Sequence, residues 1–322
     1  MSTTSAQNNI VGRFAPSPTG RMHAGNIFAA LMAWLVAKSQ GGTMVLRIED
    51  LDRARSKQCY IDQVQRDFEM LGLTWDRGPY FQHDRDEAYA AAFDALNDAG
   101  LAYPCFCTRA DLHAASAPHQ GEKLVYPGTC RHLSDVERFE KTRALFSKPD
   151  PSRIAPAMRL SVDARTIAVD DLFQGSYEQR LDRDCGDFLI RRTDGAFAYQ
   201  LAVVVDDAAQ GVNSVVRGID LLCSTPQQVY LQDLLGLEHA RYAHIPLFVD
   251  ELGRRLAKRN KSAAIDELMA CCGSPEGVVG HIAYTAGLIE FDEPATPDEL
   301  LSVFSVDRSR ALYEGRIGIP FS

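Results

Sequence analysis

Blocks of hydrophobic and polar residues along the first hundred positions predict alternating strands and helices. Residues 9–15, "NIVGRFA", are typical of a strand, and apolar residues then recur at helical spacing from Asn26 onward. Residues 41–50, "GGTMVLRIED", predict a glycine turn and a buried strand, and residues 61–71 and 84–99 predict helices. Strands and helices that alternate in this order favour a doubly wound parallel α/β sheet.

The pattern changes after residue 100 and resumes near residue 187. Residues 101–152 carry paired cysteines, prolines and histidines with little periodicity. This composition indicates an insertion that is held together by its own cysteines. Beyond it, strands are expected at 187–192, 212–218 and 244–250. Helices are expected from Tyr199, at 225–235 with Pro226 in the first turn and Gly236 after the end, and from about Ser274. The predicted division is a first half of the α/β domain at 1–104, an insertion at 105–185, the second half at 186–250, and a loop with a helical tail at 251–322.

Composition and charge narrow the class of protein. With 322 residues, 46% hydrophobic and 24% charged, the chain resembles an ordinary globular protein that is too long for one small core. Its net charge of −9 argues against non-specific coating of nucleic acid. The densest basic stretch, "RRLAKRNK" at 254–261, is by itself most simply a solvated loop.

The chain is expected to work in the cytoplasm. Its first residues, "MSTTSAQNN", are polar and lack the basic and apolar regions of a signal peptide. No run of about 18 apolar residues is present, so no membrane span is expected. The eight cysteines are therefore expected to be reduced, as free thiols or metal ligands rather than disulfides.

The turn between the first strand and the first helix reads "RFAPSPTGRMHAGN" (13–26). Free backbone N–H groups and the helix dipole make a glycine-containing turn before a helix an anion site. His23 and Asn26 stand at that end, and Gly25 lets a ligand approach the backbone closely. These residues predict a nucleotide or phosphate site, with a merely capped helix as the alternative.

Several motifs, taken in order, resemble the class I glutamyl-tRNA synthetases. "RFAPSPTG" with "HAGN" is similar to their first signature, "LRIEDLD" to the second, and "FAYQLAVVVDD" with "VVRGIDLL" to the third. "HIPLFVD" followed by "RRLAKRN" stands where that family has its lysine-bearing loop, so the resemblance runs from about residue 10 to about residue 265. It implies a class I aminoacyl-tRNA synthetase fold: a Rossmann-type parallel sheet with a zinc-stapled insertion and a short helical C-terminal module.

The resemblance also implies a reaction, in which a glutamate carboxylate attacks the α-phosphate of ATP, bound with Mg²⁺, to give glutamyl-adenylate and pyrophosphate. His23, Gly25 and Asn26 are the expected ATP contacts, and His23 is an expected catalytic residue. Lys258 is the other catalytic residue and a further ATP contact, because its ammonium can follow charge on the phosphate as the loop closes. The family has a serine where this chain has Ala257, so the charge is kept and a hydroxyl is lost.

Glutamate needs cations or donors for its two carboxylates and an anion for its ammonium group. Arg13 and Arg217 are the expected carboxylate partners, with Tyr199 as a hydrogen-bond donor. Glu49 is expected to accept the ammonium group, and Ser17 matches a contact in the first signature. Which arginine holds which carboxylate stays open. For either arginine alone, the ordinary alternative is a surface ion pair.

A structural zinc ion is predicted for the insertion from its Cys-x-Cys…Cys set, which consists of Cys105, Cys107 and Cys130. Zinc takes four ligands, so one position is open. The resemblance implies Tyr126 as the fourth ligand, whereas His132 is the chemically more usual candidate and His119 is a further one. Three buried thiols without a metal are the alternative. Packing roles are expected for the other cysteines, Cys59, Cys185, Cys223, Cys271 and Cys272.

Only residues 262–322 follow the basic loop, too few for the helical anticodon-binding region of a full glutamyl-tRNA synthetase. The chain resembles a short relative of that family, which places glutamate on the queuosine base in the anticodon of tRNA(Asp). The expected function is tRNA-independent activation of L-glutamate with ATP and transfer to that base, by a monomer with no membrane partner. Two alternatives stay open: a minimal synthetase that charges the 3′ end of tRNA(Glu), and a catalytically dead tRNA-binding paralogue.

Overall fold

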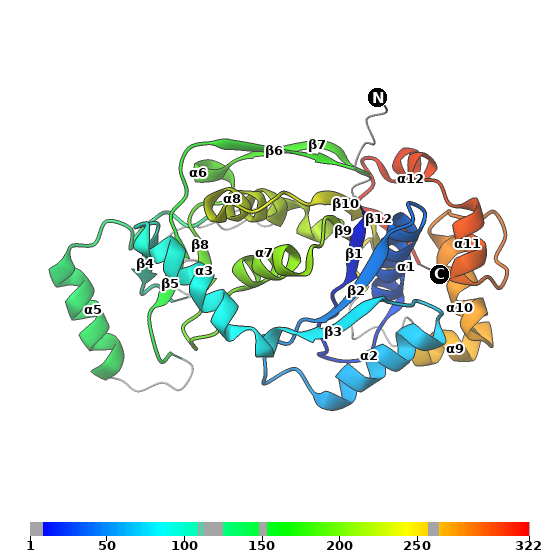
Figure 1. Ribbon diagram of the computed structural model, residues 1–322, viewed down its shortest axis with the longest axis horizontal. Coiled ribbons are helices and arrows are strands. Elements are labelled where there is room, and N and C mark those ends of the chain that lie inside the picture. The colour runs from blue at the N-terminus through cyan, green and yellow to red at the C-terminus, as the bar shows by residue number, and fades with distance from the viewer. Residues whose placement is uncertain (1–8, 109–110, 112–124, 148–152, 257–263, 322) are drawn as a thin grey trace, which may run out of the picture.

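Five parallel strands form the centre of the part of the chain that the structure describes. The computed structural model describes residues 9–108, 111, 125–147, 153–256 and 264–321. The parallel pairs are β1 (Val11–Phe14) with β2 (Thr43–Ile48), β2 with β3 (Arg77–Phe81), and β9 (Ser214–Gly218) with β10 (Arg241–Ile245). The Asn213 N–H donates to the Val11 carbonyl at 3.1 Å, so β9 lies beside β1 and the spatial order is β3-β2-β1-β9-β10 (Figure 1).

Helices cover both faces of this sheet, as a doubly wound fold requires. On one face, α1 (Ala24–Lys38) packs against β1 and β9, with α2 (Gln58–Met70) in the same core cluster. On the other face lie three helices that pack on one another, α3 (Asp86–Asp98), α7 (Tyr199–Gln210) and α8 (Thr225–Leu235) (Figure 1).

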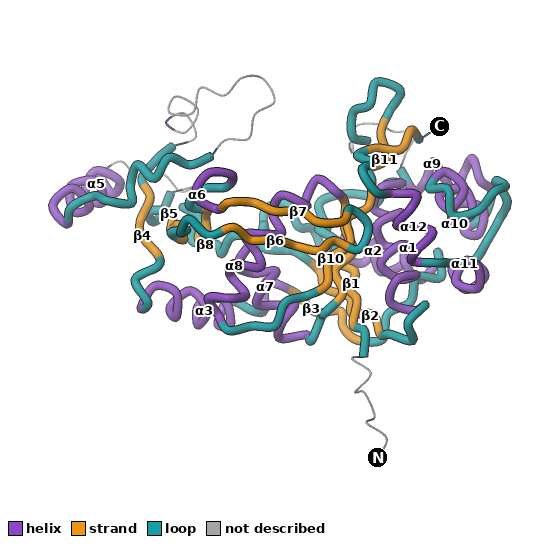
Figure 2. Tube along the Cα trace, turned by 90° about the horizontal axis from the view of Figure 1, so that it is seen from above, coloured by secondary structure: helices purple, strands orange, loops and turns teal. Residues whose placement is uncertain are grey.

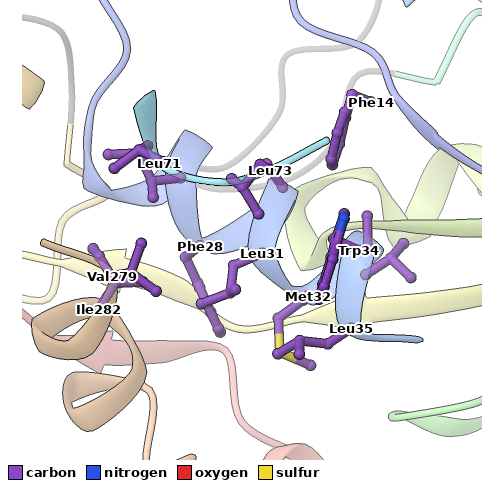
Figure 3. Close-up of a cluster of buried hydrophobic side chains, with 14 of the residues drawn as sticks. Phe14, Phe28, Leu31, Met32, Trp34, Leu35, Leu71, Leu73, Val279 and Ile282 are labelled. Atoms are coloured by element: carbon purple, nitrogen blue, oxygen red, sulfur yellow. The ribbon is translucent and has the colours of Figure 1, made fainter. Parts of the chain in front are cut away.

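The larger hydrophobic core joins α1 to the C-terminal helices. Phe28, Leu31 and Leu35 of α1 are at most 1% exposed, and they share one cluster with Val279 and Ile282 of α10 (Pro275–Thr285) (Figure 3). Fully burying such a side chain contributes about 1.5–3 kcal/mol. Helix α1 is apolar on nearly every side, so it packs between the sheet and the C-terminal helices. This packing fixes the N-terminus of α1 at the edge of the sheet.

Between α3 and α7 the chain builds an antiparallel structure. Its sheet consists of β4 (Ala102–Cys105), β5 (Ala157–Leu160) and β8 (Phe188–Arg191), from which α5 (Asp135–Ser147) projects (Figure 1). A hairpin of β6 (Thr166–Asp171) and β7 (Gly175–Arg180) runs from α6 (Leu181–Asp184) toward β10 in both views (Figure 2). The sheet straddles the predicted boundaries at residues 105 and 185, and the division of the chain stays a prediction.

The C-terminal part is helical and returns to the sheet domain through one short strand pair. Its elements are β11 (Leu247–Val249), α9 (Ile265–Cys272), α10, α11 (Pro297–Val303), α12 (Val306–Tyr313) and β12 (Gly318–Pro320), with β11 and β12 paired in parallel. Short 3₁₀ helices, η1 (Gln82–Asp84) and η2 (Ile219–Ser224), follow β3 and β9. Among the described residues, no helix has the length and apolar character to cross a membrane.

The predicted α/β fold with a parallel sheet is confirmed. The strands β3, β6 and β7 are not among the predicted elements, and two predicted elements have other bounds. Residues 244–250 are expected as one strand, but β10 ends at Ile245 and β11 begins at Leu247. Pro246 stands at the break, because proline has no N–H group to continue the pairing. The helical tail begins with α9 at Ile265, earlier than the expected Ser274.

Candidate active site

A cleft of about 520 Å³ opens at the carboxyl ends of the parallel strands. Its lining comes from β1, the turn before α1, the residue after β2, the start of α7 and the ends of β9 and β10. Ligands of open α/β sheets bind at this edge, where the strand order reverses. The cleft brings together these predicted site residues: Arg13, Ser17, His23, Gly25, Asn26, Glu49, Tyr199 and Arg217. The predicted Lys258 lies outside the described residues.

The turn before α1 presents a helix N-terminus to the cleft. The His23 N–H donates to Asn26 Oδ1 at 3.2 Å, and the Asn26 N–H donates to the His23 carbonyl at 2.8 Å. A Cβ at Gly25 would lie 3.2 Å from His23 Cε1, so the glycine leaves room for the imidazole. The partial positive charge at the start of this helix therefore faces the cleft, where it suits a phosphate group.

Arg217, at the end of β9, lines the cleft and is held by neighbouring side chains. Its Nε donates to His244 Nε2 at 3.0 Å, and its Nη2 donates to Thr225 Oγ1 at 2.9 Å. Its Nη1 donates to Gln228 Oε1 at 2.8 Å and lies 3.5 Å from Tyr199 Oη. These contacts hold the guanidinium group in one orientation at the cleft wall.

Arg13 and Arg47 flank one buried carboxylate, Asp207. Arg47 is fully buried and donates from Nη1 to Asp207 Oδ1 at 2.6 Å, and Arg13 Nε lies 3.6 Å from the same oxygen. Arg13 also donates from Nη1 to the Val216 carbonyl at 3.2 Å, which ties β1 to β9. Burial lowers the pKa of Arg13, and the Asp207 carboxylate opposes this shift. Arginine keeps its charge in proteins, so the cleft holds a fixed cation at this point.

Glu49 follows β2 and places a carboxylate beside these arginines. Arg47 Nη2 donates to Glu49 Oε1 at 3.2 Å. Burial raises the pKa of Glu49, although the charges of Arg47 and Arg13 oppose the shift. A further buried carboxylate, that of Asp206, lies 3.9 Å from Arg47 Nε and pairs with Arg85. The arginines that line the cleft, Arg13, Arg21, Arg217 and Arg255, outnumber its lining carboxylates, Glu49 and Asp220, and this excess of positive charge favours an anionic ligand.

Sequence reasoning misses several residues of this network, namely Arg47, Asp207, Thr225, Gln228 and His244. Arg47 could have been found from its place in "TMVLRI", because a charged side chain inside an otherwise apolar buried strand needs a partner. For the others, the partner becomes evident only when α7, α8 and β10 are brought together with β1, β2 and β9.

At the cleft mouth, Arg255 and Asp220 form an ion pair between the start of the basic loop and η2. Both residues line the cleft. Arg255 stands at the last described positions before residues 257–263, so the loop that carries Lys258 begins at the cleft opening.

The insertion brings three predicted metal ligands together. The sulfur atoms of Cys105, Cys107 and Cys130 lie within 4.8 Å of one another, and these residues could hold a metal ion. Tyr126 Oη lies 3.5 Å from Cys105 Sγ and 3.7 Å from Cys107 Sγ, and the Cys107 and Cys130 sulfurs are 3.6 Å apart. A tetrahedral site with Zn–S of about 2.3 Å and Zn–O of about 2.0 Å has edges of about 3.5–3.8 Å. The donor set therefore fits zinc in both chemistry and spacing.

The alternative fourth ligands do not share this geometry. His132 is exposed, and the described donors within 4.8 Å of one another do not include it. His119 lies outside the described residues. Arg159 instead supports the cluster, because its guanidinium stacks 3.7 Å above the Tyr126 ring and its Nε donates to Cys105 Sγ at 3.3 Å. Burial opposes ionisation of Cys105, but hydrogen bonds with Tyr126 and Arg159 lower the pKa of the thiol below its ordinary value.

The fold and the cleft define a class, the α/β synthetases that bind their ligands at the carboxyl edge of a Rossmann-type sheet. The family model described as "tRNA synthetases class I (E and Q), catalytic domain" matches residues 9–275. A glutamate tRNA ligase structure from Elizabethkingia meningosepticum superposes with a TM-score of 0.77 at 23% identity, over 98% of this chain and 67% of that chain. At that identity the likeness concerns the fold.

Within this class, sequence relatives are much closer. A protein from Symbiobacterium thermophilum is 45% identical over 311 residues, which cover 93% of each chain. One from Nocardia farcinica is 44% identical over 92% of this chain and 90% of its own length. Both are named Glutamyl-Q tRNA(Asp) synthetase, and the chain belongs to this family of class I synthetase enzymes.

Proposed function

We propose that this protein activates L-glutamate with ATP and transfers it to the queuosine base in the anticodon of tRNA(Asp). The observation that carries the proposal is the convergence of Arg13, Arg217, Tyr199 and Glu49 in one cleft beside the N-terminus of α1. The names of the relatives supply the acceptor, since several of them are Glutamyl-Q tRNA(Asp) synthetases.

The cleft floor suits glutamate in charge and in shape. Glutamate carries two carboxylates and one ammonium group, so its net charge of about −1 at neutral pH suits a cleft whose lining has more arginines than carboxylates. Arg13 and Arg217 bind the two carboxylates, Tyr199 donates a hydrogen bond, and Glu49 accepts the ammonium group. Ser17 adds a contact from the turn after β1.

Activation occurs where the glutamate site meets the turn before α1. His23, Gly25 and Asn26 bind ATP, which brings its Mg²⁺, so that the α-phosphate lies near the helix N-terminus. A glutamate carboxylate oxygen attacks the α-phosphorus, the bond to the β-phosphate oxygen breaks, and pyrophosphate leaves with that electron pair. His23 and Lys258 stabilise the charge that builds on the phosphate, and the resemblance of the motifs supports both roles.

The second step moves the glutamyl group to RNA. A hydroxyl oxygen of the cyclopentenediol of queuosine attacks the carbonyl carbon of the mixed anhydride, loses its proton, and AMP leaves. We propose that the first step needs no tRNA, because every group assigned to it is provided by this chain. The enzyme acts as a monomer in the cytoplasm, where its RNA and ATP substrates are available.

Zinc supports the insertion rather than the reaction. Cys105, Cys107, Tyr126 and Cys130 hold one structural ion, which fixes a segment with little hydrophobic core of its own. The proposed division of the chain follows from these roles: the two catalytic halves lie at 1–104 and 186–250, the zinc insertion at 105–185, and the lysine loop with the helical tail at 251–322.

The test is transfer of radiolabelled glutamate to three purified RNAs in parallel. They are tRNA(Asp) with queuosine, tRNA(Asp) with guanosine at that position, and tRNA(Glu). Label on the first RNA alone is the expected result. Label on tRNA(Glu) would instead assign a minimal synthetase that charges the 3′ end. An absence of both label and glutamate-dependent pyrophosphate exchange would indicate a catalytically inactive tRNA-binding protein.

A further inference from the structure

Behind the cleft wall, three buried polar side chains form a line that ends on Arg217. Asp171, His244 and Arg217 are 0%, 0% and 5% exposed. His244 Nδ1 lies 2.5 Å from Asp171 Oδ2, and Arg217 Nε donates to His244 Nε2 at 3.0 Å. His244 lies behind the cleft, whose lining continues with its neighbours Ile245 and Pro246.

The line is built by three strands from distant parts of the chain. In the parallel pairing of β9 and β10, His244 stands directly opposite Arg217. Asp171 is the last residue of β6, in the hairpin that reaches β10 from the insertion (Figures 1 and 2). Asp171 Oδ1 also accepts from the N–H groups of His244, Phe173 and Gln174 at 3.0–3.1 Å, so its position is fixed by the backbone.

The hydrogen bonds determine where His244 carries its proton. Arg217 Nε is only a donor, so His244 Nε2 must accept with its lone pair. The proton of a neutral imidazole is then on Nδ1, from where it is donated to the Asp171 carboxylate. Burial lowers the pKa of His244, which Asp171 opposes and the Arg217 charge reinforces. His244 is therefore a neutral link between an anion and a cation.

We propose that His244, oriented by Asp171, is a positioning residue that holds Arg217 toward the cleft for binding of a substrate carboxylate. This inference rests on the proposed function, in which Arg217 binds glutamate. Arg217 has five N–H groups, and the described contacts to His244, Thr225, Gln228 and Tyr199 occupy four of them. The guanidinium therefore keeps one N–H group, and the displaceable 3.5 Å contact to Tyr199, for a ligand.

The imidazole has a second consequence, because it separates two charges that would otherwise attract each other directly. A buried carboxylate and a buried guanidinium form their strongest contact as a bidentate pair. If His244 were a small apolar residue, Arg217 would be drawn toward Asp171 and away from Tyr199. As an intervening acceptor, His244 lets Asp171 stabilise the arginine without withdrawing it from the cleft.

The proposal is tested with three substitutions on the line and one control. His244→Leu removes the acceptor, and His244→Gln keeps an acceptor at about the reach of Nε2. Asp171→Asn keeps an oxygen for the backbone N–H groups but turns a donor toward Nδ1, which moves the imidazole proton to Nε2, facing Arg217. Tyr230→Phe is the control, since it removes a partly buried hydrogen bond from α8 to the Ser161 carbonyl, at 3.3 Å, that does not involve the line.

Glutamate-dependent exchange of pyrophosphate into ATP gives the KM for glutamate and for ATP separately. We expect H244L and D171N to raise the KM for glutamate by about tenfold or more, with the KM for ATP changed by less than about twofold. H244Q should recover most of the loss, and Y230F should change neither value. Equal changes in both KM values, or an unchanged KM for glutamate in both H244L and D171N, would overturn the proposal.

Two further measurements keep the result clear if a variant folds poorly. Isothermal titration measures glutamate binding on the folded fraction of D171N, which must be weakened. The ¹⁵N shifts of His244 in the wild-type protein must show protonated Nδ1 and unprotonated Nε2, and the opposite pattern would refute the proposal.

Wild-type protein that exchanges pyrophosphate with glutamate but leaves queuosine-containing tRNA(Asp) unlabelled would contradict the proposed transfer alone. Wild-type protein that binds no glutamate would overturn both proposals.

Discussion

Replacing Arg47 with methionine removes a buried charge behind the cleft but keeps an unbranched side chain. Arg47 is fully buried and bonded to Asp207, Gln210 and Glu49 at 2.6, 3.0 and 3.2 Å. Loss of one partner of a buried ion pair costs about 3–5 kcal/mol, because the remaining carboxylates stay desolvated without their counter-charge. We expect R47M to lower the free energy of unfolding by this amount.

The matched control is Arg165→Met. Arg165 donates to Asp163 Oδ2 from Nε at 3.0 Å and from Nη2 at 2.8 Å, yet its side chain is 42% exposed. An exposed pair contributes about 0–1 kcal/mol, because water and salt screen it. The two substitutions therefore remove similar ion pairs that differ mainly in burial.

Urea unfolding followed by tryptophan fluorescence measures both variants. The two tryptophans of the chain, Trp34 and Trp75, belong to or pack against the core cluster that includes β2 residues. R47M should also raise the KM for glutamate, because Glu49, which lines the cleft, loses the hydrogen bond from Arg47 Nη2 that holds it. A destabilisation below about 1 kcal/mol, or equal losses for R47M and R165M, would refute the dependence of Glu49 and Asp207 on this arginine.

Three further results are expected. Lys258→Ala should abolish most glutamate-dependent pyrophosphate exchange while glutamate binding by titration stays measurable, and equal loss of both would contradict its assigned role. Cys107→Ser should lose bound zinc, measured by atomic absorption, and should melt at a lower temperature, whereas the exposed Cys59→Ser should do neither. Burial raises the pKa of Glu49, so the carboxylate takes up a proton as the pH falls through that raised value. The protonated group no longer attracts the ammonium group of glutamate, and binding weakens. The contribution of Glu49 to the stability of the folded protein rises at the same time, because the folded state holds this proton more tightly than the unfolded state. The KM for glutamate should therefore increase as the pH is lowered from neutrality in the wild type, and a Glu49→Gln variant should show a flat profile.

Much of the fold can be predicted from local signals in the sequence. Gly236 ends α8 in the left-handed conformation with φ of 64°, as a glycine directly after a helical run predicts. Pro226 stands in the first turn of the same helix, where its missing N–H costs nothing. β3 has no such signal, since "RGPYF" contains a glycine and a proline and its side chains are mostly exposed. Its pairing with β2 becomes clear only from the assembled sheet.

The candidate site likewise contains residues that the sequence predicts and residues that only the structure reveals. Arg13, Glu49 and Arg217 stand in quoted motifs, and the structure brings them to one cleft. His244 stands in a motif as well, but its importance depends on Asp171, which is far away in the chain and reaches it through a hairpin. A buried hydrogen-bonded line of this kind has no periodicity, so pattern reasoning has nothing to detect.

The contact between β1 and β9 has a consequence for how the protein is made. The Val11 N–H donates to Asn213 Oδ1, and Arg13 donates to the Val216 carbonyl, across sequence separations of 202 and 203 residues. A ribosome adds about 5–20 residues per second, so β1 waits about 10–40 s for its neighbour. During that time one edge of the nascent sheet is open to wrong pairing. The cleft is thus among the last parts to form, and a chain released before β10 is complete carries its catalytic motifs without a site.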